Sequence, residues 1–98
     1  MQFLILAHDS TDPDALKRRM EAREAHLATI ARYKEAGHMH IGAALLDDAG
    51  KMIGSTIIAE FATRGELDAW LAEDPYVTHK VWGDIQVMAC KIAPSFVQ

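Results

Sequence analysis

The segment between Asp12 and Gly37 constrains the fold more than any other part of this 98-residue chain. Asp12 is a suitable N-cap, Pro13 occupies the first helical position that proline favours, and Gly37 can end a helix in the left-handed conformation. Between these ends, apolar residues recur at helical spacing, at Leu16, Met20, Leu27 and Ile30. The sequence therefore predicts one long helix of about two dozen residues, with an apolar stripe that packs on a sheet.

Strand-like segments surround this helix. Four stretches have the length and composition of β-strands: residues 3–7, 38–46, 52–61 and 82–92. Asp47–Gly50 joins the middle two as a hairpin, and a shorter helix follows Thr63. That helix must be interrupted at Asp74, because the residue before Pro75 is pushed out of the α region. The order β-α-β-β-α-β predicts an α+β, ferredoxin-like sandwich: a four-stranded antiparallel sheet with two helices on one face.

The first strand is apolar on both of its faces. Phe3 and Ile5 alternate with Leu4 and Leu6, whereas an antiparallel sheet with one wet face alternates polar and apolar residues. Because closed two-fold homodimers are the commonest assembly, we expect a second copy of the chain to cover the open face of the sheet. Trp82, at the start of the last strand, is expected in that dimer interface.

Composition excludes several classes of function. The formal net charge is −4, and without a basic patch the chain has no basis for binding nucleic acid. No apolar run is long enough to span a membrane, and the N-terminus does not resemble a signal peptide. The single cysteine, Cys90, permits no internal disulfide and is expected to pack as a small apolar side chain. We expect one cytoplasmic domain over residues 1–98, with no membrane partner.

Three basic side chains share one side of the predicted long helix. Arg19, Arg23 and His26 are spaced i, i+4 and i+7, and Arg23 falls on the apolar stripe itself. A guanidinium there needs a partner or water, since an unpaired buried charge is costly. One interpretation is a positive strip that receives a carboxylate or enolate-like anion, with His26 available for proton transfer. The alternative is that these side chains snorkel at the edge of the helix–sheet interface.

Asp74 also has two interpretations. An aspartate before proline at a helix start is an ordinary N-cap, which stabilises a helix by roughly 1 kcal/mol. The same carboxylate would point into the crevice between helix and sheet, where it could fix the tautomer of His26. If the two side chains meet, they form an acid–base dyad, and if they do not, Asp74 is only a cap.

The remaining candidates carry weaker signals. His38 and His40 are two apart on a strand and should face the same way, but two ligands do not complete a metal site, so no metal is expected. Gly54 and Ser55 inside a strand indicate a bulge or a close backbone approach, and Ser55 could offer its hydroxyl to the pocket. No residue is recognisable as a dedicated haem or flavin ligand, so no cofactor is expected.

The chain resembles the YciI-like (YCII-related) proteins over nearly its full length. The resemblance rests on short pieces that are fairly specific when taken together and in order: the short first strand, Arg23-x-x-His26-Leu27, Gly37, Gly42, Gly54-Ser55 followed by Ile57–Phe61, and Ala72-x-Asp74-Pro75-Tyr76-Val77. It implies a dimeric α+β barrel whose proposed site residues are His26 and Asp74, and it makes Tyr76 a further candidate for substrate contact. One departure is Lys80, which stands where the family usually has a glycine.

Two functions remain open at this point. The first is a small cofactor-free enzyme of the lyase, isomerase or dehalogenase type, acting on a small anionic or lactone-like molecule. In it His26 moves a proton, Asp74 orients His26, and Arg19, Arg23, Ser55 and Tyr76 hold the substrate. The second is a non-catalytic domain that binds a small molecule without turnover. A third class, RNA-binding sheets of the same element order, is excluded because residues 52–60 offer no aromatic platform.

Overall fold

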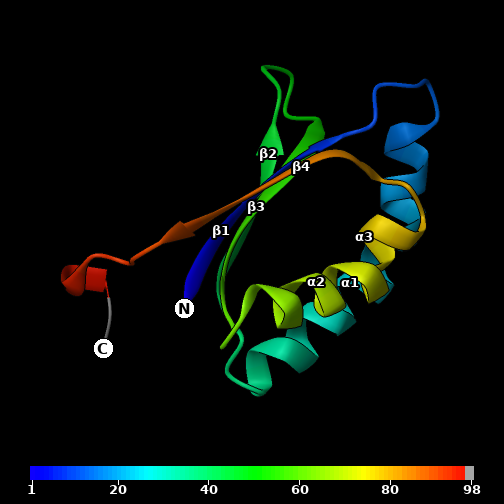
Figure 1. Ribbon diagram of the computed structural model, residues 1–98. Coiled ribbons are helices and arrows are strands. Elements are labelled where there is room, and N and C mark those ends of the chain that lie inside the picture. Colours follow the sequence, from blue (N-terminus) through cyan, green and yellow to red (C-terminus); the bar gives the residue numbers. More distant parts are fainter. Residues whose placement is uncertain (97–98) are drawn as a thin grey trace.

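The computed structural model describes residues 1–96 and has the predicted β-α-β-β-α-β order (Figure 1). The main elements are β1 (Gln2–Asp9), α1 (Ala15–Glu35), β2 (Met39–Leu46), β3 (Met52–Glu60), α2 (Arg64–Glu73), α3 (Pro75–Thr78) and β4 (Trp82–Cys90), and a short 3₁₀ turn at Pro94–Phe96 follows. The strands form one antiparallel sheet in the order β2-β3-β1-β4. The helices lie together on one face of it, so the predicted α+β sandwich is confirmed.

The start of α1 differs from the prediction. The helix begins at Ala15, and the residue before it, Asp14, makes no side-chain capping bond. Asp12 instead accepts a hydrogen bond from the Asp14 backbone N–H and two, each of 2.7 Å, from the guanidinium of Arg18. The pairing with Arg18 lowers the pKa of Asp12 to about 2. The other end is as expected, with Gly37 at a φ of +89° just beyond the helix.

The buried face of α1 is also not the predicted apolar stripe. Met20 and Leu27 are 54% and 46% exposed. The side that faces the sheet and α3 carries Ala15, Arg19, Ala22, His26 and Thr29. At 3.6 residues per turn this face lies roughly a quarter turn from the predicted one. The helix therefore turns small and polar side chains inward, which leaves room for a site.

The break between α2 and α3 is built around Asp74. Thr63 caps the start of α2 by accepting a hydrogen bond from the Glu66 N–H, and the helix ends at Glu73. Asp74 has extended backbone angles (φ −66°, ψ 131°), as expected before proline, and its side chain caps α3 by accepting from the Tyr76 N–H. The capping interpretation of Asp74 is thus correct, and it directs the carboxylate toward α1.

The core lies between the helices and the inner face of the sheet. Phe3, Ile5 and Ala7 of β1 project into it together with Trp70 and Trp82. Trp82 is 6% exposed and belongs to this inner layer, so its expected place in a dimer interface was wrong. It points inward because the β1–β4 register shifts between His8 and Asp9, the residue opposite Trp82.

A close backbone approach occurs at Gly54, as predicted. A Cβ atom at this position would lie 2.5 Å from the carbonyl oxygen of Ala7 on the neighbouring strand β1. Only glycine fits there without a shift of the backbone. The absent side chain brings β3 close to β1 and places Ser55, the next residue, on the inner face.

The outer face of the sheet carries no helix (Figure 1), and its centre is apolar. Leu4 of β1 lies in register between Ile58 of β3 and Met88 of β4, and Ile41 of β2 follows beside Ile58. Met88 and Ile41 are 44% and 63% exposed. Among the described residues, no helix has both the length and the apolar character needed to cross a membrane.

Candidate active site

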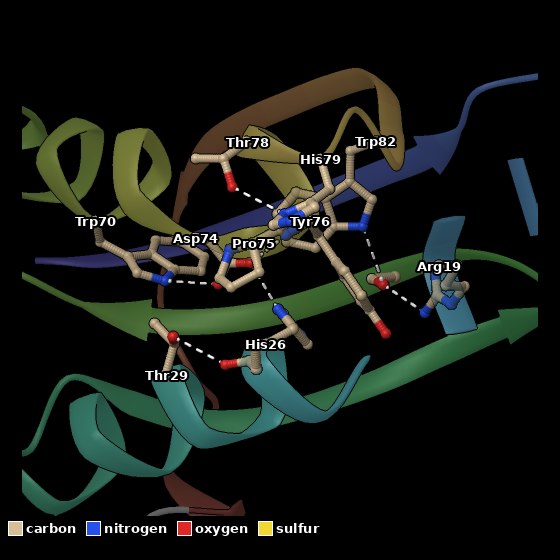
Figure 2. A network of polar contacts seen from close by, with 12 residues as sticks. Arg19, His26, Thr29, Trp70, Asp74, Pro75, Tyr76, Thr78, His79 and Trp82 are labelled. Atoms are coloured by element: carbon tan, nitrogen blue, oxygen red, sulfur yellow. Dashed lines mark hydrogen bonds and ion pairs between the residues drawn. The ribbon is translucent and has the colours of Figure 1, made fainter. Parts of the chain in front are cut away.

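The imidazole of His26 and the carboxylate of Asp74 meet between α1 and α3. Nδ1 of His26 lies 2.7 Å from Oδ1 of Asp74. The carboxylate is fully buried and also accepts hydrogen bonds from the Tyr76 backbone N–H (2.9 Å) and from Nε1 of Trp70 (3.1 Å), as Figure 2 shows in part. With two donors fixed by the fold, the carboxylate cannot turn away from the histidine.

The ring of His26 is contacted on one face as well as at its edge. Tyr76 stacks on it with 3.8 Å between ring centroids and 8° between ring planes, and Trp82 approaches edge-on at 5.6 Å. The second nitrogen, Nε2, makes no hydrogen bond within residues 1–96 and is not among their fully enclosed unpaired atoms. The ring also lines a cavity, so Nε2 is the ring nitrogen that the described residues leave open to it.

A second polar network lies beside this pair. Arg19 is almost fully buried, and its guanidinium donates to Oδ1 of Asp9 (2.8 Å) and to Oγ of Ser55 (2.9 Å). The same guanidinium lies over the Tyr76 ring, 4.8 Å from its centroid. Arg19 therefore connects the end of β1, the middle of β3 and the aromatic ring that covers His26.

The hydroxyl of Ser55 is directed by its two neighbours. Its oxygen accepts from Arg19 and from Nε1 of Trp82 (3.2 Å), and both of these groups can only donate (Figure 2). Both lone pairs of the oxygen are therefore engaged, and the hydroxyl proton must point elsewhere. Ser55 lines the cavity, so this proton is available to an oxygen atom of a bound molecule.

Burial and charge shift two pKa values in this region. Burial raises the pKa of Asp9, although Arg19 opposes the shift by its charge and its hydrogen bond. Burial also raises the pKa of Tyr76, with the charges of Arg19 and Arg23 acting in the opposite direction. The Tyr76 phenol therefore stays protonated at neutral pH. It makes no hydrogen bond within the described residues, and in Figure 2 its hydroxyl points away from the α3 backbone.

Arg19, His26, Ser55 and Tyr76 line one end of a cavity of about 350 Å³ between α1 and the sheet. Its apolar wall comes from α1 and from β2 and β3, at Leu27, Ile30, Met39, Ile41, Gly42, Ala43, Ala44, Met52 and Ile57. Its charged or titratable nitrogen groups are Arg19, Arg23, His26, Lys34 and His40. No aspartate or glutamate from residues 1–96 lines it, although the chain as a whole is acidic. The cavity is suited to a small molecule with negative charge.

The predicted site residues are thus brought together, but they do not all have the same surroundings. Both terminal nitrogens of Arg19 are engaged, so it positions other groups. Arg23 is exposed at the cavity wall, and residues 1–96 supply it with no hydrogen bond or ion pair. Its predicted place on a buried apolar stripe was wrong, because the stripe itself does not face the core. The catalytic and binding roles of these residues stay predictions.

The two histidines expected to share one strand do not: His38 lies just before β2, and only His40 belongs to it. His40 is the extra residue of a β-bulge, because Met39 pairs with Ala59 and Ile41 with Ile58. Nδ1 of His38 instead bonds to the backbone oxygen of Glu60, and Nε2 of His40 lies 2.6 Å from the Glu60 carboxylate. No group of three or more metal-ligating side chains occurs among residues 1–96.

Lys80 lies outside the cavity wall. Its φ is +57°, so it occupies the left-handed region in which a glycine carries no strain. Its carbonyl oxygen accepts hydrogen bonds from Ser10 and Arg18, while its side chain is exposed. A glycine at this position would adopt the same backbone conformation without strain, and the Lys80 side chain does not line the cavity.

Four residues near the site were not found from the sequence. Asp9 holds Arg19, Trp70 donates to Asp74, Trp82 donates to Ser55, and Lys34 lines the far end of the cavity. Only Asp9 carried a usable signal, as an acidic residue at the end of an otherwise apolar strand. The others depend on tertiary contacts.

A family model for the YCII-related domain matches residues 1–91. The chain belongs to the YCII-related domain family. Protein YciI of Escherichia coli O6:H1 is 34% identical to it over 97 residues, with 93% of this chain and 97% of YciI covered. An uncharacterized protein of Haemophilus influenzae is 31% identical with the same coverage.

Among solved structures, this YCII-related chain is similar to 5-chloro-2-hydroxyhydroquinone dehydrochlorinase (TftG) of Burkholderia phenoliruptrix, in complex with 2,5-dihydroxybenzoquinone. The TM-score is 0.82 at 26% identity, and the match covers 97% of this chain and 98% of that one. The structural neighbours are of the dimeric α+β barrel type, which confirms the fold class.

Proposed function

We propose that this protein is a cofactor-free acid–base enzyme of the lyase or isomerase type, acting on a small anionic, oxygen-rich ring. The observation that carries the proposal is the surroundings of His26. Its Nδ1 is engaged by the fully buried carboxylate of Asp74, and its Nε2 is open to a cavity that no acidic side chain from residues 1–96 lines. An imidazole fixed in this way takes and returns a proton at one nitrogen, and such a step contributes about 10²–10⁴ in rate.

Each further residue has a role in this proposal. The guanidinium of Arg23, for which residues 1–96 supply no hydrogen bond or ion pair, stabilises the negative charge that develops when a ring hydroxyl or an acidic carbon loses its proton. Ser55 and the protonated Tyr76 donate hydrogen bonds to ring oxygens. Arg19 acts indirectly, because it fixes the orientation of Ser55 and contacts the Tyr76 ring.

The similarity to a dehydrochlorinase supports one concrete reaction. A chlorinated hydroxyhydroquinone first takes up a proton on the carbon that bears chlorine, while an adjacent hydroxyl loses one and becomes a carbonyl. Chloride then leaves with the C–Cl bonding pair as a second hydroxyl proton passes to His26. The net loss is HCl, and the ring is oxidised at the expense of the carbon–chlorine bond, so no external oxidant is needed.

The experiment is a turnover assay with 5-chloro-2-hydroxyhydroquinone and with small lactones, read as released chloride and by ultraviolet absorbance. We expect turnover by the wild type and a loss of about 10²–10⁴ in kcat for H26Q. H79Q is the matched control, because His79 is exposed and does not line the cavity. Saturable binding of 2,5-dihydroxybenzoquinone without turnover of any compound would instead identify a binding domain.

We also propose that two copies pair through the outer face of the sheet. The exposed Ile41 and Met88 and the half-buried Leu4 and Ile58 lie side by side there, in register across the four strands. A fold of the dimeric α+β barrel type supports this pairing. Burying this surface stabilises the pair at about 25 cal/mol for each Å² of apolar area removed from water.

A further inference from the structure

The cavity extends beyond the acid–base site in one direction, along α1. The wall residues of α1 run from Arg19 and Arg23 past His26 and Ile30 to Lys34. At 1.5 Å per residue, Lys34 lies about 12 Å along the helix axis from His26. The side chain of a helical residue leans toward the helix N-terminus, so the stem of Lys34 leans toward His26, and Lys34 lines the cavity.

The opposite wall of the cavity includes β2, which runs back along α1. The chain turns sharply after α1, with the His38 N–H donating to the Tyr33 carbonyl, and β2 then runs back along the helix (Figure 1). His40 therefore lies opposite Lys34 at the far end of the cavity, while Gly42 and Ala44 lie closer to the acid–base site. The bulge in β2 falls at His40 itself and re-aims this residue.

Between the two ends the wall is apolar. Leu27 and Ile30 of α1 face Met39, Gly42 and Ile57 of the sheet. A volume of about 350 Å³ exceeds the needs of one six-membered ring and falls in the range of pockets that hold drug-sized ligands. The cavity thus has a polar reacting end, an apolar middle and a second cationic end.

The charge at the far end belongs chiefly to Lys34. Residues 1–96 supply its ammonium with no hydrogen bond or ion pair, whereas His40 is engaged by Glu60. The Glu60 carboxylate is also contacted by Gln2, and the terminal ammonium lies 4.0 Å away. Glu60 does not line the cavity and makes no ion pair with Lys34, so Lys34 is the cation that the cavity offers at this end.

We propose that Lys34 forms a distal anion subsite at the end of the cavity that His40 borders, and that the substrate is an acidic ring bearing an alkyl chain that ends in a carboxylate. The ring lies at His26 and Tyr76, the chain crosses the apolar middle, and the carboxylate reaches Lys34. This inference rests on the proposed function for the placement of the ring. It goes beyond a bare hydroxyquinone, which would leave the distal end of the cavity empty.

The test measures binding by calorimetry at low and high salt, so that it does not depend on turnover. The probes are 2,5-dihydroxyphenylacetate, whose carboxylate cannot reach Lys34, and 6-(2,5-dihydroxyphenyl)hexanoate, each compared with its carboxamide. We expect the wild type to prefer the long carboxylate to its amide by about fivefold. Arg23 can attract the short carboxylate, so the short pair is the reference whose preference should not depend on Lys34. The preference for the long carboxylate should weaken with salt.

Variants assign the preference to its residue. K34Q should lose the preference for the long carboxylate, while K17Q, which changes a lysine of the same helix outside the cavity, should retain it. Equal binding of the long acid and its amide by the wild type, or a preference that survives in K34Q, would overturn the distal subsite. H26Q separates the two proposals: it should abolish turnover and keep the preference, and unchanged turnover in H26Q would count against the proposed function alone.

Discussion

The phenol ring of Tyr76 lies parallel to the imidazole of His26, with 3.8 Å between their centroids. This contact covers one face of the imidazole, while Asp74 engages its Nδ1 edge. The same tripeptide, Asp74-Pro75-Tyr76, therefore supplies both the stacking partner and the hydrogen-bond partner. A short helix of four residues is enough for this, because its N-cap and its first turn point the two side chains at one target.

Replacing Asp74 by asparagine should disturb both the tautomer of His26 and stability. Three donors converge on the carboxylate, but an amide has one acceptor oxygen, so at least one donor is left facing an NH₂ group. We expect D74N to lower the free energy of unfolding by about 1–3 kcal/mol and kcat by about 10²–10⁴. Long-range ¹H–¹⁵N spectra should show Nδ1–H in the wild type and a changed tautomer in the variant.

The neighbouring carboxylate provides the control. Glu73 pairs with Arg32 and Tyr33 at the surface and touches none of the site residues. E73Q should therefore leave the tautomer and turnover unchanged. A D74N protein with wild-type histidine signals would show that the carboxylate does not set the state of the ring.

Removing Arg19 should make the free energy of unfolding fall more steeply as the pH rises. Asp9 and Arg19 are 7% and 3% exposed, so R19M leaves a buried carboxylate unpaired, at a cost of about 3 kcal/mol at neutral pH. Burial already raises the folded-state pKa of Asp9, and loss of Arg19 removes the groups that oppose this. A raised folded pKa means that stability is lost as pH rises from the unfolded value of 3.8 through the folded one.

Urea unfolding of R19M at pH 4 and pH 7 would measure this effect. The deficit should be smaller at the lower pH, and D9N/R19M should recover part of it because no buried charge remains. R18M is the matched control, since Arg18 pairs with an exposed aspartate, Asp12. An equal deficit of R19M at both pH values would contradict the argument.

Substituting glycine for Lys80 should stabilise the protein. A left-handed conformation costs a non-glycine residue about 1–2 kcal/mol, and glycine offsets part of this through its more flexible unfolded state. We expect K80G to raise the free energy of unfolding by about 0.5–1 kcal/mol, measured by urea denaturation. K80A keeps the strain and should give no gain, so a gain in K80A would show that the lysine side chain, not the backbone, was responsible.

A charge on the outer face of the sheet should separate the proposed dimer. Met88 is 44% exposed and lies beside Leu4, so M88K is tolerated by the monomer but places an ammonium in the interface. Sedimentation should show a dimer for the wild type and a monomer for M88K. M20K, on an exposed position of α1, should remain dimeric. A monomeric wild type at high concentration would end the proposal.

The element order could be read from the sequence because its signals are local. The apolar runs of the strands, the turn at Asp47–Gly50 and the break before Pro75 each depend on neighbouring residues only, and all three occur where expected. The close approach at Gly54 was also readable, since a glycine within a strand has few other causes.

The buried face of α1 could not be read, and the reason is physical. Hydrophobic periodicity assumes that the inward face is the most apolar one, but here Arg19, His26 and Thr29 face inward because partners from other elements satisfy them. Leu27 and Ile30 are partly exposed because they line the cavity instead of filling the core. The difference between the apolar face predicted for α1 and the face that is buried therefore indicates where the site lies.

The position of β2 at the edge of the sheet has a consequence for ligand entry. Among the described residues this strand pairs with β3 alone, so the part of the cavity wall that it forms is also the free edge of the sheet. A ligand that enters beside this edge would approach His26 between α1 and β2, without any separation of the helices from the sheet.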